Sequence, residues 1–414
     1  MRYVVLGASA AAISGVRSIR KNDKNAEIIL ISKDDKIYSR CILHRYLSGI
    51  RTIPQLNFAE ADFEKRYNVN WIKGNGVKKL INEENKLILD DDTKVYYDRL
   101  LIATGSSPSF PPIENIEKCK NVYGFRNISD VDSINEKLPE AKNIVVLGAG
   151  LVGMDVTTGL IEKGIEKLTL IDFEDRVLSK QIDEKASNVY ANILKSHNVN
   201  LIFKKACKSV QHDENGNVVS ITITDDIIVP CDLLIVTIGV KSNVGFLKGS
   251  SVEVDKFGVV TDELCHTNIE NIYAAGDVTG KGPIWPIAVK EGIVAGTNIT
   301  GGNARMEDFF YSKSTMNFFG VNTMVIGLSK KPDDTYVEEI FIDDENDIYK
   351  KVIHKDGIIA GATLQGDLSY GGILTRLVSA KIDFRKVKKS VFKIDYSDFF
   401  HIDENAQYYY GEQG

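Results

Sequence analysis

Short apolar runs that end in glycine recur along the chain and predict buried strands that lead into turns. The first run covers residues 3–6, helical periodicity follows over 8–20, and a second apolar run covers 27–31. Strand, helix and strand in this order predict a β-α-β unit. Residues 100–105 form a further buried run that ends in glycine.

The same plan begins again after residue 142. The run 143–147 leads into a glycine-rich turn, a helix over 154–163 and a strand over 168–172, and residues 233–239 repeat the strand-to-glycine form. Two copies of one plan predict two nucleotide-binding units. The expected fold is therefore α/β with two Rossmann-like dinucleotide-binding domains.

The pattern changes after residue 302. Strand-like runs at 349–353 and 357–364 and a helix over 371–380 predict a small C-terminal α+β domain. The last residues, 408–414, are expected to form a frayed tail.

The composition is that of a globular protein of two or three domains. The chain has 414 residues, of which 43% are hydrophobic and 26% are charged. A net charge of −6 offers no basic face for nucleic acid. No run reaches the roughly 18–20 apolar residues of a membrane span, and the N-terminus has no signal-peptide pattern. We therefore expect a cytoplasmic protein with no membrane contact.

The 5 cysteines and 6 histidines do not follow a metal-binding pattern. No pair of cysteines has the C-x-x-C or C-x-x-x-x-C spacing, which argues against a zinc site, an iron–sulfur cluster and a local redox disulfide. No metal is therefore predicted.

The second glycine-rich turn has the complete dinucleotide-binding pattern, with Gly148, Gly150 and Gly153 between a strand and a helix. These glycines allow a tight turn, a close approach of the diphosphate, and close packing of helix on strand. Asp172 ends the next strand, where a carboxylate can bind ribose hydroxyls and repel the additional phosphate of NADP. The pattern predicts an NAD site, with a chance glycine-rich turn as the weaker alternative.

The first turn, residues 7–12, departs from this pattern. Ser9 and Ala12 replace two of the glycines, and Ser32 stands where the acid is expected. These residues alone leave a nucleotide site and a plain α/β turn equally open.

Three further segments, residues 103–105, 237–239 and 271–278, resemble those of the two-dinucleotide-domain flavoproteins. Over essentially its whole length the chain resembles this pyridine nucleotide-disulfide oxidoreductase superfamily, whose domains are of the glutathione-reductase type. The most specific segment contains Gly276 and Asp277, and the resemblance implies that Asp277 binds the ribityl and diphosphate part of FAD. It also implies that the first turn holds the FAD diphosphate and the second holds NAD.

The resemblance extends to a set of FAD-binding residues, namely Gly7, Ser9, Ala10, Ala11, Ser32, Arg40, Arg45, Val77, Ala103, Thr104, Gly105, Gly276, Asp277, Trp285 and Ala288. The implied NAD-binding residues are Gly148, Gly150, Leu151, Val152, Gly153, Asp155, Asp172 and Gly239. The implied domains are an FAD-binding domain in two parts (1–110 and 237–302), an NAD-binding domain (111–236) and a C-terminal α+β interface domain (303–414).

Residues 38–45 resemble the Tyr-x-Arg-Pro-Pro-Leu-Ser-Lys pattern of the ferredoxin-, rubredoxin- and nitrite-reductase branch. Tyr38, Arg40 and Leu43 match this pattern. Arg45 takes the place of the lysine near the flavin, so it is expected to stabilise the reduced, anionic flavin. Residues 303–414 resemble the C-terminal domain of the same branch.

Cys41 replaces the first proline of this pattern and has two interpretations. It coincides with the single redox cysteine of NADH oxidases, peroxidases and coenzyme A disulfide reductases, and Arg40 and Arg45 together with a helix N-terminus would then lower the pKa of its thiol. It lacks the flanking serine and glycine of that motif, however, which favours a small buried residue in a proline position. We therefore expect the non-thiol interpretation.

Two further positions near the predicted redox centre carry ionisable groups. His44 is expected on the surface of a helix. Asp155 takes the place of a family glutamate near the nicotinamide, where capping or orienting the start of the helix and a purely structural role are about equally expected.

The resemblance implies an FAD-dependent NAD(P)H oxidoreductase, in which NADH reduces the flavin and the electrons pass to a second acceptor. The first hypothesis is a reductase for a small redox protein such as rubredoxin. The second is an NADH oxidase, peroxidase or coenzyme A disulfide (persulfide) reductase that uses Cys41 on a thiol or oxygen acceptor. A third, non-enzymatic hypothesis is a flavin-based redox sensor or scaffold. Formation of a homodimer stays open.

Overall fold

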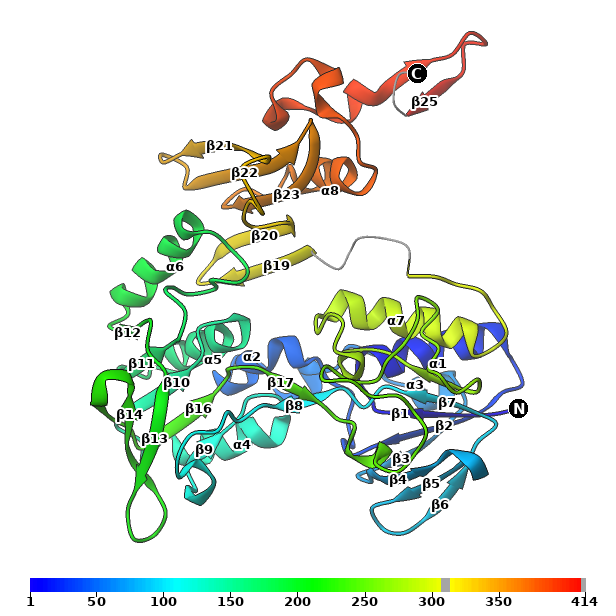
Figure 1. Ribbon diagram of the computed structural model, residues 1–414, viewed down its shortest axis with the longest axis vertical. Coiled ribbons are helices and arrows are strands. Elements are labelled where there is room, and N and C mark those ends of the chain that lie inside the picture. Colours follow the sequence, from blue (N-terminus) through cyan, green and yellow to red (C-terminus); the bar gives the residue numbers. More distant parts are fainter. Residues whose placement is uncertain (307–312, 411–414) are drawn as a thin grey trace. The chain divides into compact units, whose positions relative to one another are not determined.

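The computed structural model describes residues 1–306 and 313–410, with Tyr410 described by its main chain alone (Figure 1). Its contacts divide the chain into two compact units, which we describe separately. The first unit comprises Met1–Leu147, Asp155–Ile165 and Cys207–Glu307, and the second comprises Gly148–Met154, Glu166–Ala206 and Asp308–Gly414.

A parallel five-stranded sheet forms the centre of the first unit. Its strand order is β18 (Ile272–Ala274), β7 (Arg99–Ile102), β1 (Arg2–Leu6), β2 (Glu27–Ser32) and β3 (Val69–Lys73). Continuous apolar runs suit this position, because both faces of a parallel sheet are covered.

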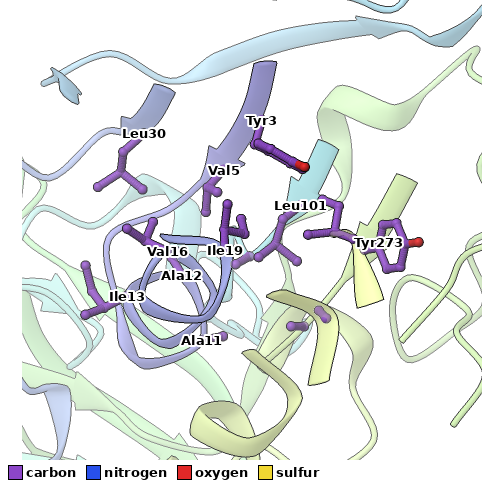
Figure 2. Close-up of a cluster of buried hydrophobic side chains, with 14 of the residues drawn as sticks. Tyr3, Val5, Ala11, Ala12, Ile13, Val16, Ile19, Leu30, Leu101 and Tyr273 are labelled. Atoms are coloured by element: carbon purple, nitrogen blue, oxygen red, sulfur yellow. The ribbon is translucent and has the colours of Figure 1, made fainter. Parts of the chain in front are cut away.

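Alternate residues of β1 belong to two hydrophobic clusters on opposite faces of the sheet. Tyr3 and Val5 belong to the cluster that contains side chains of helix α1 (Ala10–Asn22), as Figure 2 shows. Val4 and Leu6 belong to a second cluster. That cluster includes buried side chains from an antiparallel sheet made of β4 (Val77–Ile81), β5 (Lys86–Leu89) and β6 (Lys94–Tyr96).

Helix α1 packs closely against helix α7 (Trp285–Asn298). A Cβ atom at Gly292 would lie 2.2 Å from the backbone oxygen of Ala11, so only glycine permits this approach. The two helices thereby hold the first glycine-rich turn and the end of β18 in one rigid body.

A second group of parallel strands in the first unit contains β10 (Ile144–Leu147), β16 (Leu233–Val236) and β9 (Val122–Tyr123). Its helices are α4 (Ile128–Lys137) and α5 (Leu151–Glu162), although the first turn of α5 belongs to the second unit.

The remaining strands of this unit form small antiparallel sheets, namely β13 (Cys207–His212), β14 (Val218–Ile223) and β15 (Ile227–Pro230) in one, and β8 (Ser106–Pro108) and β17 (Val240–Ser242) in another. Its short helices are η1 (Arg40–Ile42), α2 (Leu43–Leu47), η2 (Ile53–Leu56), α3 (Phe63–Arg66), η3 (Asn82–Glu84), η4 (Ile116–Lys118), η5 (Thr224–Asp226), η6 (Gly245–Leu247) and η7 (Asp277–Thr279).

The second unit joins part of the predicted NAD-binding domain to the C-terminal domain. It contains the parallel pair β11 (Leu168–Ile171) and β12 (Asn200–Ile202) and helix α6 (Glu184–Ser196). Its antiparallel sheet has the order β19 (Lys313–Phe318), β20 (Val321–Gly327), β23 (Ile358–Gln365), β22 (Ile348–Lys355) and β21 (Val337–Asp343). The other elements are α8 (Gly371–Ser379), η9 (Phe384–Val387), η10 (Val391–Lys393), η11 (Tyr396–Phe399), β24 (Phe400–Ile402) and β25 (Tyr408–Tyr410).

Polar contacts attach α6 to this C-terminal sheet. The hydroxyl of Tyr190 lies 2.6 Å from that of Thr323, and the Gln365 amide donates to the backbone oxygen of Ala186 at 3.1 Å. The buried ammonium of Lys351 forms an ion pair with Asp183, the N-cap of α6.

The predicted fold class is confirmed, with local corrections. Helix α7 begins at Trp285, and Pro286 lies in its first turn, where proline is tolerated. The frayed tail is wrong for Tyr408–Tyr410, which pair with β24, while residues 411–414 lie outside the described residues. Among the described helices, none has the length and apolar character needed to cross a membrane.

Candidate FAD and NAD site

The first glycine-rich turn brings backbone N–H groups to the end of β1. Gly7 has a φ of 108°, and a Cβ atom there would lie 2.2 Å from the backbone oxygen of Ala103. Ser9 is the N-cap of α1, and its side chain makes no capping hydrogen bond to the described residues. Because Ala10 and Ala11 are also small, the N-terminus of α1 can accept a diphosphate. The turn therefore fits the predicted FAD diphosphate.

Gly276 and Asp277 follow strand β18 and approach the same helix. Gly276 has a φ of 82°, and a Cβ atom there would lie 2.9 Å from that of Ala11. The carboxylate of the buried Glu291 on α7 accepts a hydrogen bond from the Gly276 N–H at 2.6 Å. This bond fixes the turn that presents Asp277.

Asp277 binds a cation that sequence reasoning missed. Its carboxylate forms an ion pair with Arg126 and accepts a hydrogen bond from Ser106 at 3.1 Å. No local pattern marks Arg126, because 151 residues separate it from Asp277. Together these side chains provide both donors and an acceptor where the ribityl and diphosphate part of FAD is expected.

Arg40 and Ser32 are held by neighbours in the same segment. The Arg40 guanidinium lies 2.6 Å from the carboxylate of Asp34, which also accepts a 3.0 Å bond from the Tyr38 hydroxyl. The Ser32 hydroxyl donates to the backbone oxygen of Asp34 and accepts the indole N–H of Trp71 at 2.9 Å. Ser32 therefore organises the loop that carries Asp34, and direct binding of FAD by either residue stays a prediction.

The other predicted FAD residues lie at turns or helix starts. Thr104 and Asn243 exchange hydrogen bonds of 2.9 Å, and a Cβ atom at Gly105 would have no described atom within 4 Å. The Trp285 ring packs edge-on against Phe58 at 4.6 Å. Val77, Ala103 and Ala288 are buried or half-buried. The open side of Gly105 is compatible with a bound ligand.

Cys41 lies in η1 and is exposed, which corrects the predicted small buried residue, and its thiol is not activated by Arg40 or Arg45. Desolvation of the sulfur raises the pKa of the Cys41 thiol, and the negative charge of Asp155 raises it further. The positive charge of Arg126 opposes this change. Arg40 is bound to Asp34, and Arg45 lies 2.5 Å from Glu162. The expected lowering of the pKa by Arg40 and Arg45 is therefore wrong.

His44 is buried, which corrects its predicted place on a helix surface. Only 8% of the surface of His44 is exposed to solvent, and its Nδ1 lies 3.2 Å from a carboxylate oxygen of Asp155. A Cβ atom at Gly159 would lie 2.8 Å from the His44 backbone oxygen, so the missing side chain lets α2 and α5 approach. The histidine could not be placed from sequence, because the helices that enclose it are far apart in the chain.

Burial shifts both partners of this pair toward their neutral forms. It raises the pKa of Asp155 to about 8, although Arg45 opposes the shift. Burial, with Arg45 and Arg51, lowers the pKa of His44 to about 4. At neutral pH a protonated Asp155 carboxyl therefore faces a neutral His44 ring, whose Nδ1 has no hydrogen-bond partner among the described residues.

The second glycine-rich turn, in the second unit, is held by Asp172. Gly148 has a φ of 105°, and its N–H donates to Ile171 at 2.8 Å. The Asp172 carboxylate accepts hydrogen bonds from the backbone N–H groups of Ala149 and Glu174, the latter at 2.8 Å. Asp172 thus organises the turn and keeps a carboxylate at the end of β11.

The second turn also leaves room for a ligand. A Cβ atom at Gly150 would have no described atom within 4 Å, and Leu151, Val152 and Gly153 begin helix α5. These features fit an NAD diphosphate at a helix N-terminus. Asp155 and Gly239 belong to the first unit, so their part in NAD binding stays a prediction.

Comparisons with known proteins identify the family of the chain. Residues 1–292 match the pyridine nucleotide-disulphide oxidoreductase family, and residues 313–382 match the rubredoxin NAD+ reductase C-terminal domain. The epsilon subunit of NADH-dependent phenylglyoxylate dehydrogenase from Aromatoleum evansii is 26% identical over 399 residues, which cover 94% of this chain and 93% of that subunit.

Two other relatives cover less of the chain. An NADH oxidase from Methanocaldococcus jannaschii is 28% identical over 324 residues, which cover 74% of this chain and 71% of that protein. A rubredoxin-NAD(+) reductase from Alcanivorax borkumensis is 27% identical over 276 residues, which cover 66% and 71%.

The fold is similar to that of a water-forming NADH oxidase from Lactobacillus brevis bound to NADH. The TM-score is 0.83 at 22% identity, with 94% of this chain and 93% of that chain covered. The chain therefore belongs to the pyridine nucleotide-disulphide oxidoreductase family, in the branch with a rubredoxin reductase-type C-terminal domain, and is an oxidoreductase that uses FAD and NAD(H).

Proposed function

We propose that this NADH-dependent flavin oxidoreductase passes its electrons to a small redox protein of the rubredoxin type. The observation that carries the proposal is the charge arrangement at Cys41. Arg40 and Arg45 are each bound to a carboxylate, and partial desolvation of the sulfur together with Asp155 raises the pKa of the exposed Cys41. Without a thiolate nucleophile, electrons leave the flavin without passing through a cysteine.

Bound FAD would supply the hydride acceptor and the store of two electrons. Asp277 and Arg126 would hold its ribityl and diphosphate part, and the N-terminus of α1 would bind the diphosphate. Asp172 would orient the adenosine ribose of NADH through its carboxylate, while its bonds to backbone N–H groups keep the second turn in shape.

The C-terminal domain supports the same acceptor class. Residues 313–382 match a domain named after rubredoxin NAD+ reductase, and a relative at 27% identity is a rubredoxin-NAD(+) reductase. Small redox proteins accept single electrons through weak, transient contacts, so an acceptor site of this kind leaves no sequence motif.

The test is NADH-driven reduction of an added rubredoxin by wild-type protein and by Cys41→Ser. We expect the rates of the two proteins to agree within about twofold, because Cys41 carries no electrons in this account. Cys119→Ser is the matched control, since it changes another partly buried thiol away from the described FAD residues. Loss of turnover in Cys41→Ser alone, with FAD still bound, would overturn the proposal.

A second candidate function is favoured by the position of Cys41. The residue is exposed, and Arg126 and Asp277 both affect its thiol electrostatically. A cysteine beside the predicted FAD site suits an NADH oxidase or a persulfide reductase, and a relative at 28% identity is an NADH oxidase. Under this candidate, the Cys41→Ser variant loses turnover with oxygen, peroxide or a persulfide and reduces rubredoxin slowly.

A further inference from the structure

The charges around Cys41 are matched in pairs, except at Asp155. Arg40 binds Asp34, Arg45 binds Glu162, and Arg126 binds Asp277. Asp155 faces the ring of His44 instead of a permanent cation. Among these carboxyl groups of the described residues, Asp155 is therefore the one that can be protonated and neutral near neutral pH.

Packing keeps Asp155 and His44 in register. Consecutive residues of α2, His44 and Arg45, contact two residues of α5 that lie two turns apart, Asp155 and Glu162. Gly159 lies between these contacts and receives the backbone of His44. The 3.2 Å contact between Asp155 and Nδ1 of His44 is thus held in place by backbone contact between two helices.

The Asp155–His44 pair is electrostatically coupled to the predicted redox centre. Asp155 has the largest effect of any charge on the Cys41 thiol, and Arg126 and Asp277 act on the same thiol. Cys41 precedes His44 by one helical turn in the continuous segment of η1 and α2. A charge on Asp155 would therefore be felt where Asp277 and Arg126 are expected to hold the flavin.

We propose that Asp155, positioned by His44, is the proton switch of the redox centre. Protonated Asp155 leaves the pair neutral, so the site can receive the negative charge of a hydride without repulsion. Ionised Asp155 places a carboxylate there that no described cation neutralises. Reduction then draws one proton from solvent onto Asp155, so that NADH and H⁺ are consumed and NAD⁺ leaves while the reduced site retains the hydride and the carboxyl proton.

Other charged groups face the Asp155–His44 pair and set where it titrates. Arg45 favours ionisation of Asp155, and Arg45 and Arg51 oppose a charge on His44. Cys41 is a second titratable group, because the charge of Asp155 acts on its thiol and the pKa of this thiol is raised. A test must therefore separate Asp155 from Cys41.

The test is the midpoint potential of the bound flavin, together with proton uptake on two-electron reduction, measured from pH 6 to about pH 10. We expect proton uptake by wild-type protein to rise by up to one proton as the pH passes about 8, where Asp155 ionises. Asp155→Asn should abolish this rise, because asparagine has nearly the same shape as aspartate but cannot ionise. Cys41→Ser should retain it.

Two further variants keep the test decisive if Asp155→Asn folds poorly. His44→Leu replaces the polar ring beside Asp155 with an apolar side chain, which disfavours the ionised carboxylate and should move the rise to higher pH, whereas His44→Gln, which keeps a polar group there, should shift it less. Asp132→Asn is the matched control, because it removes a carboxylate that binds Tyr46 on the same helix α2.

An unchanged rise in Asp155→Asn, or its loss in Cys41→Ser, would overturn the proposal. The inference rests on FAD and NADH chemistry and not on the acceptor proposed above. A failed rubredoxin assay with a normal proton count would therefore reject only the acceptor.

Discussion

The two glycine-rich turns of the chain both allow the following helix to pack closely, but the glycines that permit this lie in different places. The second turn keeps Gly148, Gly150 and Gly153 within its own loop, whereas the first keeps only Gly7. In the first copy, close packing of the helix depends on glycines of the facing helix α7. A Cβ atom at Gly292 would lie 2.2 Å from a backbone oxygen of α1.

This difference teaches that a degraded motif can belong to an intact site. The methyl group of Ala11 is tolerated because Gly276 has no side chain, and the backbone of Ala11 can approach α7 because Gly292 has none. The acids differ in the same way. Asp172 holds the second turn directly through the N–H of Ala149, while the segment after β2 uses Ser32 and the backbone of Asp34.

The largest effect should come from Gly7→Ala. The new Cβ atom would lie 2.2 Å from a backbone oxygen at a φ of 108°, so we expect a loss of about 3 kcal/mol or more in unfolding free energy and little retained FAD. Thermal unfolding and flavin content measure both effects.

Gly150→Ala is the matched control in the other turn. Its Cβ atom would meet no described atom within 4 Å, so its stability should change by less than about 0.5 kcal/mol while NADH binds more weakly. Equal destabilisation by the two variants would contradict the comparison.

Sequence reasoning was strongest where function depends on residues close together in the chain. The strands before each turn, Asp172 and the Gly276–Asp277 turn follow from local patterns. Arg126 and the burial of His44 could not be predicted, because their partners Asp277 and Asp155 are brought near only by tertiary packing. The lowered pKa that the thiol interpretation of Cys41 requires fails for the same reason, since desolvation and Asp155 raise the pKa while Arg40 and Arg45 pair with Asp34 and Glu162.

The next effect concerns the pH dependence of stability at Glu291, which holds the first site. Burial raises its pKa from 4.5 to about 7. The fold therefore favours the protonated carboxyl, and this stability is lost as the pH rises from 4.5 to about 7. Glu291→Gln should gain on wild type by up to roughly 3 kcal/mol across this interval.

Urea unfolding at pH 5 and pH 8 measures this difference for both proteins. The side-chain amide of the Glu291→Gln variant can still accept the Gly276 N–H, so the turn should be kept. A constant difference between the proteins at the two pH values would show that Glu291 is ionised in the folded state at both.

A smaller effect is expected at Arg126. Replacing it with Met leaves Asp277 without its cation, which should cost about 2 kcal/mol and weaken FAD binding more than tenfold. Arg126→Lys should recover part of the affinity. Flavin release measured by fluorescence tests this order, and equal affinity of all three proteins would remove Arg126 from the site.

The smallest effect is expected at Asp172. Asp172→Ala removes the acceptor for the N–H groups of Ala149 and Glu174 and the carboxylate that repels a 2′-phosphate. We expect the KM for NADH to rise about tenfold while that for NADPH changes less. A parallel change for both nucleotides would mean that Asp172 only shapes the turn.

The central claim is that electrons pass from NADH through flavin to an acceptor without a redox-active cysteine. Anaerobic titration of the oxidised protein with NADH tests this most directly. We predict complete flavin reduction by one NADH per FAD in wild-type protein and in Cys41→Ser, followed by transfer of two electrons to added rubredoxin. A second equivalent of NADH that wild-type protein consumes and Cys41→Ser does not would contradict the account.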